Sequence, residues 1–168
     1  MEFEIPPSSE LTLLPYTRLH GVCRIVNANG KEITDEEYSV VNLFSQSLFS
    51  QVDVECGGIN LAFQDNLYHY KSYFETMLTY GFDSKYSHLT TSLFYKDTPG
   101  RFDNLSGENQ GYLKRRQNVK NVKLFDFCSP LHVDFLNSPR VIPPFVKIKL
   151  KFIRSKDSFS ILSNCGEE

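Results

Sequence analysis

The chain has 168 residues, 40% of them hydrophobic, which is enough for a single domain with a substantial core. Its 18 basic and 20 acidic residues give a formal net charge of −2, so the chain as a whole has no field that would attract nucleic acid. No apolar run reaches the roughly 20 residues of a membrane-spanning helix, and we expect no membrane partner. The 14 Phe and 9 Tyr residues favour β structure.

The first ten residues, MEFEIPPSSE, predict a flexible N-terminal arm. Pro6-Pro7 and Ser8-Ser9 disfavour regular strand pairing in this segment. The segment also lacks the apolar stretch of a signal peptide, so we expect a protein that is not secreted.

Two strands and a short helix are predicted in the next part of the chain. Residues 22–26 form a β-rich run that is closed by Asn29-Gly30, a dipeptide typical of tight hairpin turns. Residues 50–56 alternate apolar and acidic side chains and stop at Gly57-Gly58, which predicts a half-buried strand. Upstream of it, VVNLFSQSLF spaces its apolar residues at helical intervals, and a short helix leading into the strand is the favoured interpretation.

The clearest helix lies at about residues 66–80. Its apolar residues recur at i, i+3, i+4, i+7 and i+8, at Tyr70, Tyr73, Phe74, Met77 and Leu78. Such a stripe favours core packing over a cofactor site, and Gly81 is a suitable C-terminal stop. The turn-forming residues 103–112 then predict an exposed loop.

The segment FVKIKLKFI predicts a strand at residues 146–153 with one buried face. Its other face carries Lys147, Lys149 and Lys151. These lysines suggest either a nucleic-acid stripe, extended by Lys114, Arg115, Arg116, Arg140 and Arg154, or a solvated face whose charges discourage edge-to-edge pairing. We favour the solvated face, and a nucleic-acid partner is disfavoured.

Several short strands, one helix and no βαβ rhythm predict an all-β protein, an antiparallel jelly-roll β-sandwich with one inserted helix at about 66–80. The predicted organisation is a flexible arm at residues 1–10, a single jelly-roll domain at 11–163 and a C-terminal tail at 164–168.

The segment CSPLHVDF gathers three residue types that occur in active sites: Cys128, His132 and Asp134. His-x-Asp begins the facial triad of non-haem iron oxygenases, but that triad needs a later histidine, and His20, His69 and His88 all come earlier. A cysteine nucleophile needs a histidine base, and strand positions four residues apart lie roughly 13 Å from one another. The order and spacing of these residues therefore favour structural roles for Cys128, His132 and Asp134.

The other cysteines suggest no metal site. His20 and Cys23 form half of a zinc motif without a second half, and Cys56 and Cys165 stand far apart. Reduced thiols are the favoured interpretation, with two disulfides in a secreted protein as the alternative. We predict no catalytic, cofactor-binding or metal-binding residues, no cofactor and no enzymatic activity.

Four separated segments go further: NLFSQSLFSQVDVECGG, YHYKSYFETMLTYGFDSKYSHLTTSLFYKDTPGRFD, NQGYLKRR and PLHVDFLNSPRVIPPFVKIKLKFIRSKDSFSIL. In this order they resemble the major capsid (hexon) protein of Polinton/Maverick-type elements and adintoviruses, over about residues 10–163. The resemblance implies a double jelly roll, with two sandwiches in a chain and three chains in a capsomer. This chain would match the first jelly roll only, since it ends where that domain should finish.

The resemblance therefore implies a viral or transposon-derived structural protein. Its partners would be copies of itself or a second jelly-roll domain, and it would lie in a virion if assembled, or otherwise in the cytoplasm or nucleus. The apolar run at residues 40–54 would then have a structural role and would not be a functional site, with Leu48, Phe49, Val52 and Val54 buried in the sandwich.

Two other functions compete with this one. A β-sandwich binding module for a carbohydrate or peptide would need an exposed aromatic platform, for which Tyr95, Phe102 and Tyr112 are the candidates. A metal-dependent enzyme on a cupin-like jelly roll is disfavoured by the order of the histidines.

Overall fold

The computed structural model describes residues 1–27, 29–31, 33, 38–61, 66–102, 104–105, 107–120 and 123–163. The chain folds as two compact units, neither of them continuous in sequence. Unit 1 comprises Met1–Leu19, Phe49–Thr79 and Pro130–Ser155, and unit 2 comprises His20–Leu48, Tyr80–Ser129 and Lys156–Glu168. The described residues are mostly β structure in several small antiparallel sheets, with a few helices.

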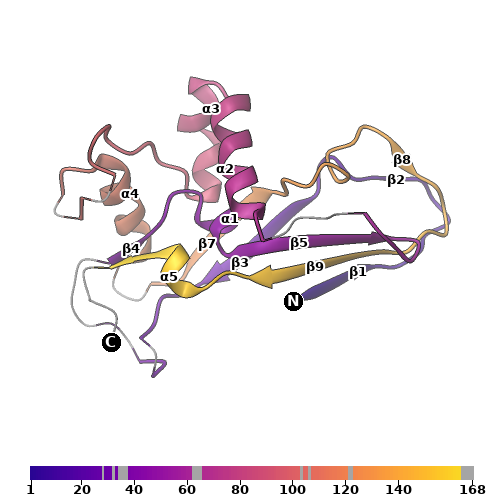
Figure 1. The fold of residues 1–168 in the computed structure, drawn as a ribbon, viewed down its shortest axis with the longest axis horizontal. Coiled ribbons are helices and arrows are strands. Elements are labelled where there is room, and N and C mark those ends of the chain that lie inside the picture. Colours follow the sequence, from indigo (N-terminus) through magenta and orange to yellow (C-terminus); the bar gives the residue numbers. More distant parts are fainter. Residues whose placement is uncertain are drawn as a thin grey trace. The chain divides into compact units, whose positions relative to one another are not determined.

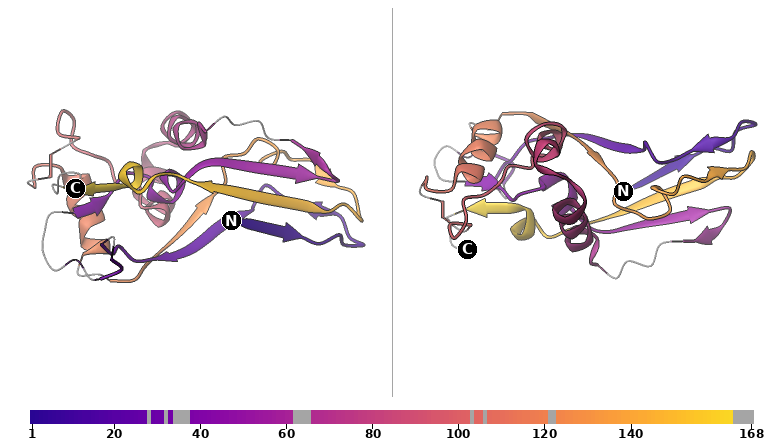
Figure 2. Two further views of the ribbon diagram at one scale, coloured as in Figure 1. Left: turned by 60° about the horizontal axis from the view of Figure 1, so that its bottom comes forward. Right: turned by 90° about the horizontal axis from the view of Figure 1, so that it is seen from above.

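Unit 1 is built on a four-stranded antiparallel sheet in the order β1-β9-β5-β6 (Figures 1 and 2). Its strands are β1 (Glu2–Ile5), β9 (Ile148–Arg154), β5 (Phe49–Cys56) and β6 (Ile59–Asn60). A separate pair in the same unit joins β2 (Thr12–Leu13) to β8 (Val141–Ile142). The strands expected at 50–56 and 146–153 are confirmed, although Val146 and Lys147 precede β9.

The expectation that residues 1–10 lack regular pairing is wrong for Glu2–Ile5. This segment pairs with β9 from Glu2 opposite Lys151 to Ile5 opposite Ile148. Pro6-Pro7 follow the strand and do not interrupt it, so every backbone N–H of β1 remains available for pairing.

The alternation in β9 has its predicted effect. Ile148, Leu150 and Phe152 are buried, and Val52 and Val54 of β5 lie opposite Phe152 and Leu150. The Phe152 ring packs edge-on against Phe3 and Phe49, with centroid distances of 5.6 and 5.0 Å. Apart from Phe3, which is 43% exposed, each of these side chains contributes about 1.5–3 kcal/mol by burial. Part of the apolar run that ends at residue 54 is therefore the core of unit 1.

Helix α2 (Tyr68–Thr79) confirms the predicted helix but not its orientation. It packs against β5 with the face that carries Tyr68, Ser72 and Thr76, all three fully buried. The predicted core stripe is exposed, at Tyr70, Tyr73, Phe74, Met77 and Leu78. Short Ser and Thr side chains allow a helix to approach a sheet closely, which explains why this face points inward.

Helix α2 ends at Thr79, so the predicted stop before Gly81 is confirmed, but its expected geometry is not. Gly81 has φ −71° and precedes α3 (Phe82–Tyr86) as its N-cap, so it does not adopt the left-handed conformation of a C-terminal cap.

Unit 2 combines a small sheet with short helices. Strand β4 (Tyr38–Val40) pairs with β10 (Ile161–Ser163). Helix α1 (Phe44–Ser47) confirms the short helix expected before β5. The remaining helical segments are α3, a 3-10 helix at His88–Ser92, α4 (Gln110–Val119) and α5 (Asp157–Ser160). The prediction of one inserted helix is therefore wrong, and the loop expected at 103–112 ends where α4 begins.

The first predicted hairpin is only partly correct. Strand β3 spans Arg18–Cys23 and pairs with β7 (Phe125–Pro130), so it begins before the expected 22–26 and ends earlier. A tight turn does form at Gly30, which has φ 72° and donates its N–H to the Asn27 carbonyl at 2.9 Å. The turn at Gly57-Gly58 is confirmed, since both residues have positive φ and join β5 to β6. Residues 164–168 lie outside the described residues.

The Phe152 cluster allows a test of the core of unit 1. Phe152→Ala should lower the free energy of unfolding by about 3–5 kcal/mol, because it leaves a cavity between Phe3 and Phe49. Phe145→Ala is the matched control, since Phe145 is 74% exposed and its loss should cost about 0.5 kcal/mol or less. Urea unfolding measures both variants, and equal losses would contradict this account of the core.

Candidate functional site

The three candidate residues of CSPLHVDF do not form a catalytic constellation. His132 is buried in unit 1, where its Nδ1 lies 2.7 Å from Glu75 Oε2 on α2. Its backbone N–H donates to the Tyr68 hydroxyl at 3.4 Å, and burial raises the pKa of that hydroxyl. Asp134 is exposed and pairs with Lys71 of α2 at 2.5 Å. The contacts of His132 and Asp134 thus hold the segment that follows β7 against α2.

Cys128 belongs to unit 2, where it lies in β7 beside a pocket of about 420 Å³. Lys123, Asp126 and Asn118 also line this pocket, and none of its described lining residues is a histidine. The Cys128 carbonyl accepts a hydrogen bond from Thr91 Oγ1 at 2.8 Å. Among the described lining residues, the pocket brings a thiol and charged groups together without the histidine that the sequence argument required for a cysteine nucleophile.

The proposed half zinc motif likewise gains no further ligand. His20 Nε2 lies 3.7 Å from Asp126 Oδ2, and both side chains are largely exposed. Over the described part of the chain, no three His, Cys, Asp or Glu side chains come together as metal ligands would. Cys56 and Cys128 form no disulfide.

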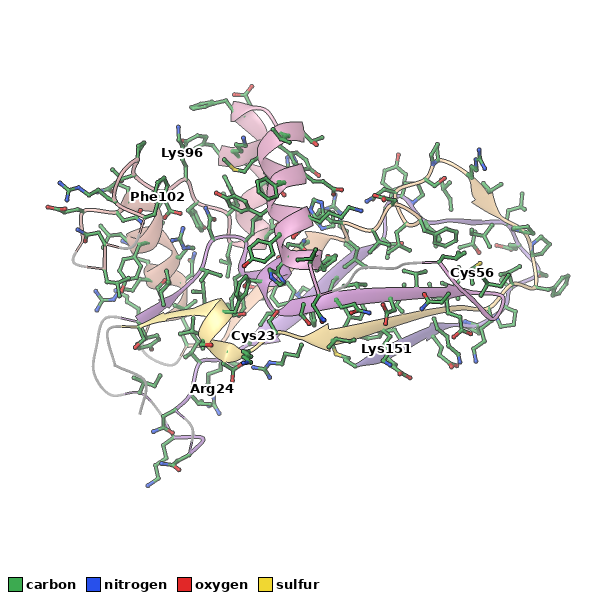
Figure 3. The ribbon with its side chains drawn as sticks, viewed as in Figure 1. Cys23, Arg24, Cys56, Lys96, Phe102 and Lys151 are labelled. Carbon is green, nitrogen blue, oxygen red and sulfur yellow. The ribbon has the colours of Figure 1, made fainter. Side chains whose placement is uncertain are left out.

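The lysine row of β9 faces carboxylates from both neighbouring strands. Lys147 Nζ lies 2.8 Å from Glu4 Oε2, and Lys149 Nζ lies 3.8 Å from Glu4 and 3.9 Å from Glu55. The hydrogen bond from Lys147 is the main cause that lowers the pKa of Glu4. Lys151, labelled in Figure 3, has Glu2 and Asp53 as its register partners. The positive charges are therefore compensated within the sheet.

Both interpretations of the lysine row need correction. Strand β9 pairs with β1 on one side and β5 on the other, so its lysines do not protect a sheet edge. The nucleic-acid stripe loses one of its members, because Arg115 is 1% exposed. The aromatic platform of a binding module is also not present as predicted. Phe102, labelled in Figure 3, is exposed, but Tyr112 is fully buried.

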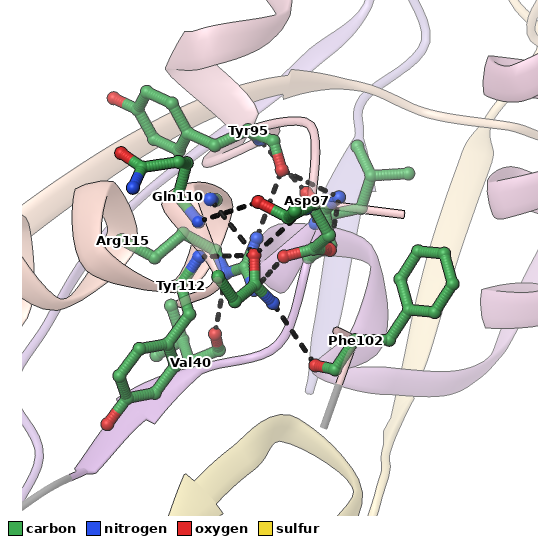
Figure 4. Close-up of polar contacts among 12 residues, drawn as sticks. Val40, Tyr95, Asp97, Phe102, Gln110, Tyr112 and Arg115 are labelled. Atoms are coloured by element: carbon green, nitrogen blue, oxygen red, sulfur yellow. Dashed lines mark hydrogen bonds and ion pairs between the residues drawn. The ribbon is translucent and has the colours of Figure 1, made fainter. Parts of the chain in front are cut away.

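The most highly organised polar site of unit 2 centres on Arg115, and sequence reasoning assigned this residue to the surface. Its guanidinium donates to three acceptors: Nε to the Val40 carbonyl at 2.9 Å, Nη1 to the Tyr95 carbonyl at 3.1 Å and Nη2 to Asp97 Oδ1 at 2.8 Å (Figure 4). These acceptors come from β4 and from the loop after the 3-10 helix, while Arg115 comes from α4. One side chain therefore joins three segments of the chain.

Asn42 completes the shell around the acceptors. Its Nδ2 donates to the Tyr95 carbonyl at 3.0 Å and to Asp97 Oδ2 at 3.3 Å. Its Oδ1 accepts the Tyr95 N–H at 3.0 Å. Both carboxylate oxygens of Asp97 are thus bonded, which offsets the cost of burying the ion pair.

Asn109 holds the start of α4 beside the same loop. Its Oδ1 accepts N–H groups from Gly111 at 3.1 Å and Tyr112 at 3.4 Å, as an N-cap residue does. The same oxygen accepts the Thr98 N–H at 3.2 Å, and Nδ2 donates to the Phe102 carbonyl at 3.2 Å. Asn109 is fully buried. The turn-forming composition of residues 103–112 concealed this cap in the sequence.

Gly111 allows α4 to lie close to the loop that carries Tyr95 and Asp97. A Cβ at this position would lie 2.6 Å from Asp97 Oδ1 and 2.7 Å from the Tyr95 carbonyl oxygen, closer than real Cβ contacts allow. Gly111, Asp97 and Arg115 are therefore mutually dependent. We name the set Val40, Asn42, Tyr95, Asp97, Asn109, Gly111 and Arg115 the Arg115 network. Its side chains bond mainly to backbone groups of the network and of adjoining residues, so its geometry suits holding the backbone in place.

Comparison with known proteins adds no relative: no family model, no curated protein and no solved structure matches this chain. None of the described helices combines the length and the apolar character that a membrane crossing needs.

The first prediction from the Arg115 network concerns the guanidinium. Arg115→Ala should lower the free energy of unfolding by about 3–5 kcal/mol, because it removes the cation that pairs with buried Asp97 and the donor that Arg115 supplies to the Val40 and Tyr95 carbonyls. Arg115→Lys should recover less than half of this loss, since an ammonium cannot reproduce the planar fork. Chemical denaturation measures all variants. Arg101→Ala is the control: its ion pair with Glu108 is exposed, so it should cost about 0–1 kcal/mol, and equal losses at both positions would contradict the network.

The second prediction uses two helix-terminal glycines. Gly111→Ala should destabilise the protein by about 1–3 kcal/mol, although alanine normally favours a helix by about 1 kcal/mol, because the methyl group forces α4 away from Asp97. Gly81→Ala meets nothing within 4 Å and should be neutral or slightly stabilising. Thermal unfolding compares the two, and a stabilising Gly111→Ala would disprove the close approach.

Proposed function

We propose that this chain is a structural protein that acts by association, a jelly-roll unit of a capsid of the Polinton/Maverick and adintovirus type. One observation carries the proposal. Two of the segments that bear the resemblance, the one ending in YKDTPGRFD and NQGYLKRR, meet in the Arg115 network. Asp97 comes from the first segment and Gly111 and Arg115 come from the second, so the residues that carry the resemblance also depend on one another in space.

The strand pairing, the buried apolar run and the bonded polar groups also agree with a structural role for the chain. Antiparallel pairing dominates the sheet of unit 1, as a jelly roll requires. Within the apolar run, Val40, Phe44, Phe49, Val52 and Val54 are buried. His132, a candidate for chemistry in the sequence, and Arg115, a candidate for a nucleic-acid stripe, both bond to neighbouring segments. A binding module is less well supported, because Tyr112 cannot contribute to an exposed platform.

The test of this proposal is assembly. We expect the chain to form oligomers or to precipitate near neutral pH, since a net charge of −2 gives little self-repulsion. Light scattering over a tenfold concentration range measures this, and electron microscopy shows whether the oligomers form regular arrays. Co-expression with a second jelly-roll domain of the family should keep the chain in solution as a complex. A chain that forms neither arrays nor a complex at any concentration, whether it is a monomer or a dimer, would overturn the proposal.

A further inference from the structure

Helix α2 presents an apolar surface on the side opposite to the sheet of unit 1. At about 100° per residue, Tyr68, Ser72 and Thr76 share one side of the helix and face β5. The opposite side carries Tyr70, Tyr73, Phe74, Met77 and Leu78, which we name the outer face of α2. Phe74 is 60% exposed and Leu78 is 85% exposed. A stripe with the periodicity of a buried helix face thus points away from its own sheet.

The outer face carries no charge. Within Tyr68–Thr79, where every residue is described, the residues charged at neutral pH are Lys71 and Glu75, since burial lowers the pKa of His69. Lys71 lies at the border of the outer face, about 20° around the helix from Leu78, and Glu75 lies nearer the sheet. Both are paired, Lys71 with Asp134 and Glu75 with His132. A nucleic acid or a charged peptide would find no ionic partner on the outer face, whereas an uncharged face is complementary to a copy of itself.

Composition and area also favour a second copy. Tyr, Phe and Met are enriched at the centres of protein interfaces. The five side chains expose on the order of 500 Å², within the roughly 300–600 Å² of the largest apolar patch on a typical monomer, a patch that is often functional. Two such faces would bury about 1,000 Å² in total, close to the lower limit for specific interfaces. This area suits a weak symmetric contact that other contacts reinforce in a larger assembly.

We propose that the outer face of α2 packs against the same face of a second copy of this chain, as two antiparallel helices related by a two-fold axis. This inference rests on the proposed function, which requires copies to meet, and it assigns the surface by which they do so. Phe74 is the middle residue of the face and lies nearest the axis. A charge at position 74 would therefore meet the same charge from the other copy.

The experiment is a charge exchange in the full chain. Phe74→Glu and Phe74→Lys should each weaken dimerisation about tenfold or more, because two like charges are buried together. An equimolar mixture of the two variants should restore dimers, since the opposite charges then meet across the axis. Sedimentation velocity over about a hundredfold concentration range measures all three samples. Tyr16→Glu is the matched control, because Tyr16 is 80% exposed in a turn of unit 1 and does not belong to the outer face of α2, and it should leave dimerisation unchanged.

Three results would overturn the inference. They are a wild-type chain that remains monomeric, a dimer that neither charge weakens, and a mixture that does not recover. A chain that is monomeric alone but binds a second jelly-roll domain through Phe74 would also overturn it, and would assign the outer face to that domain.

The failure of this inference can be told apart from the failure of the proposed function. Regular arrays that persist in Phe74→Glu would remove the α2 contact and leave the capsid proposal standing. A Phe74-dependent dimer without arrays or a complex would do the reverse.

Discussion

The burial of one guanidinium is the constraint on which unit 2 depends. Arg115 is almost inaccessible, so water cannot satisfy its donors, and the chain must supply acceptors in the plane of the guanidinium group. Two of them are backbone carbonyls, at Val40 and Tyr95, which ties the position of the main chain to the side chain. Since Asn42 and Asn109 bond the same loop, the path of residues 95–102 is set by polar contacts more than by apolar packing.

The sequence predicted those elements whose periodicity matches their burial. Strands β5 and β9 alternate apolar and charged residues, and the sheet buries the apolar side of each. The alternation with a period of two residues was therefore sufficient to predict both strands and their buried faces. Helix α2 had an equally regular pattern, yet its orientation was predicted wrongly, because periodicity identifies an apolar side without showing whether that side meets the core or solvent. The small side chains Ser72 and Thr76 were the signal for the inward face.

Arg115 could not be placed from sequence for a different reason. It lies in the basic stretch KRRQ, where composition indicates a solvated surface, and its acceptors come from residues that are 75, 20 and 18 positions away. Only Asn109, a side chain that can cap a helix two residues before Gly111, was a local signal of α4. Strand β1 was not predicted because the restriction that Pro6-Pro7 place on pairing was applied to the whole segment, whereas it does not reach the four residues that precede them.

The two faces of α2 divide stability from association. A helix that buried its aromatic stripe would gain more hydrophobic stabilisation than one that buries Ser72 and Thr76, so the observed orientation is costly for an isolated unit. On the flank of the helix, Lys71 pairs with Asp134 and Glu75 pairs with His132. In the proposed contact, the apolar side would be covered by a second copy of the chain. An arrangement of this kind is expected in a protein whose folded state is completed by its neighbours, because the burial that the single chain forgoes is recovered on assembly.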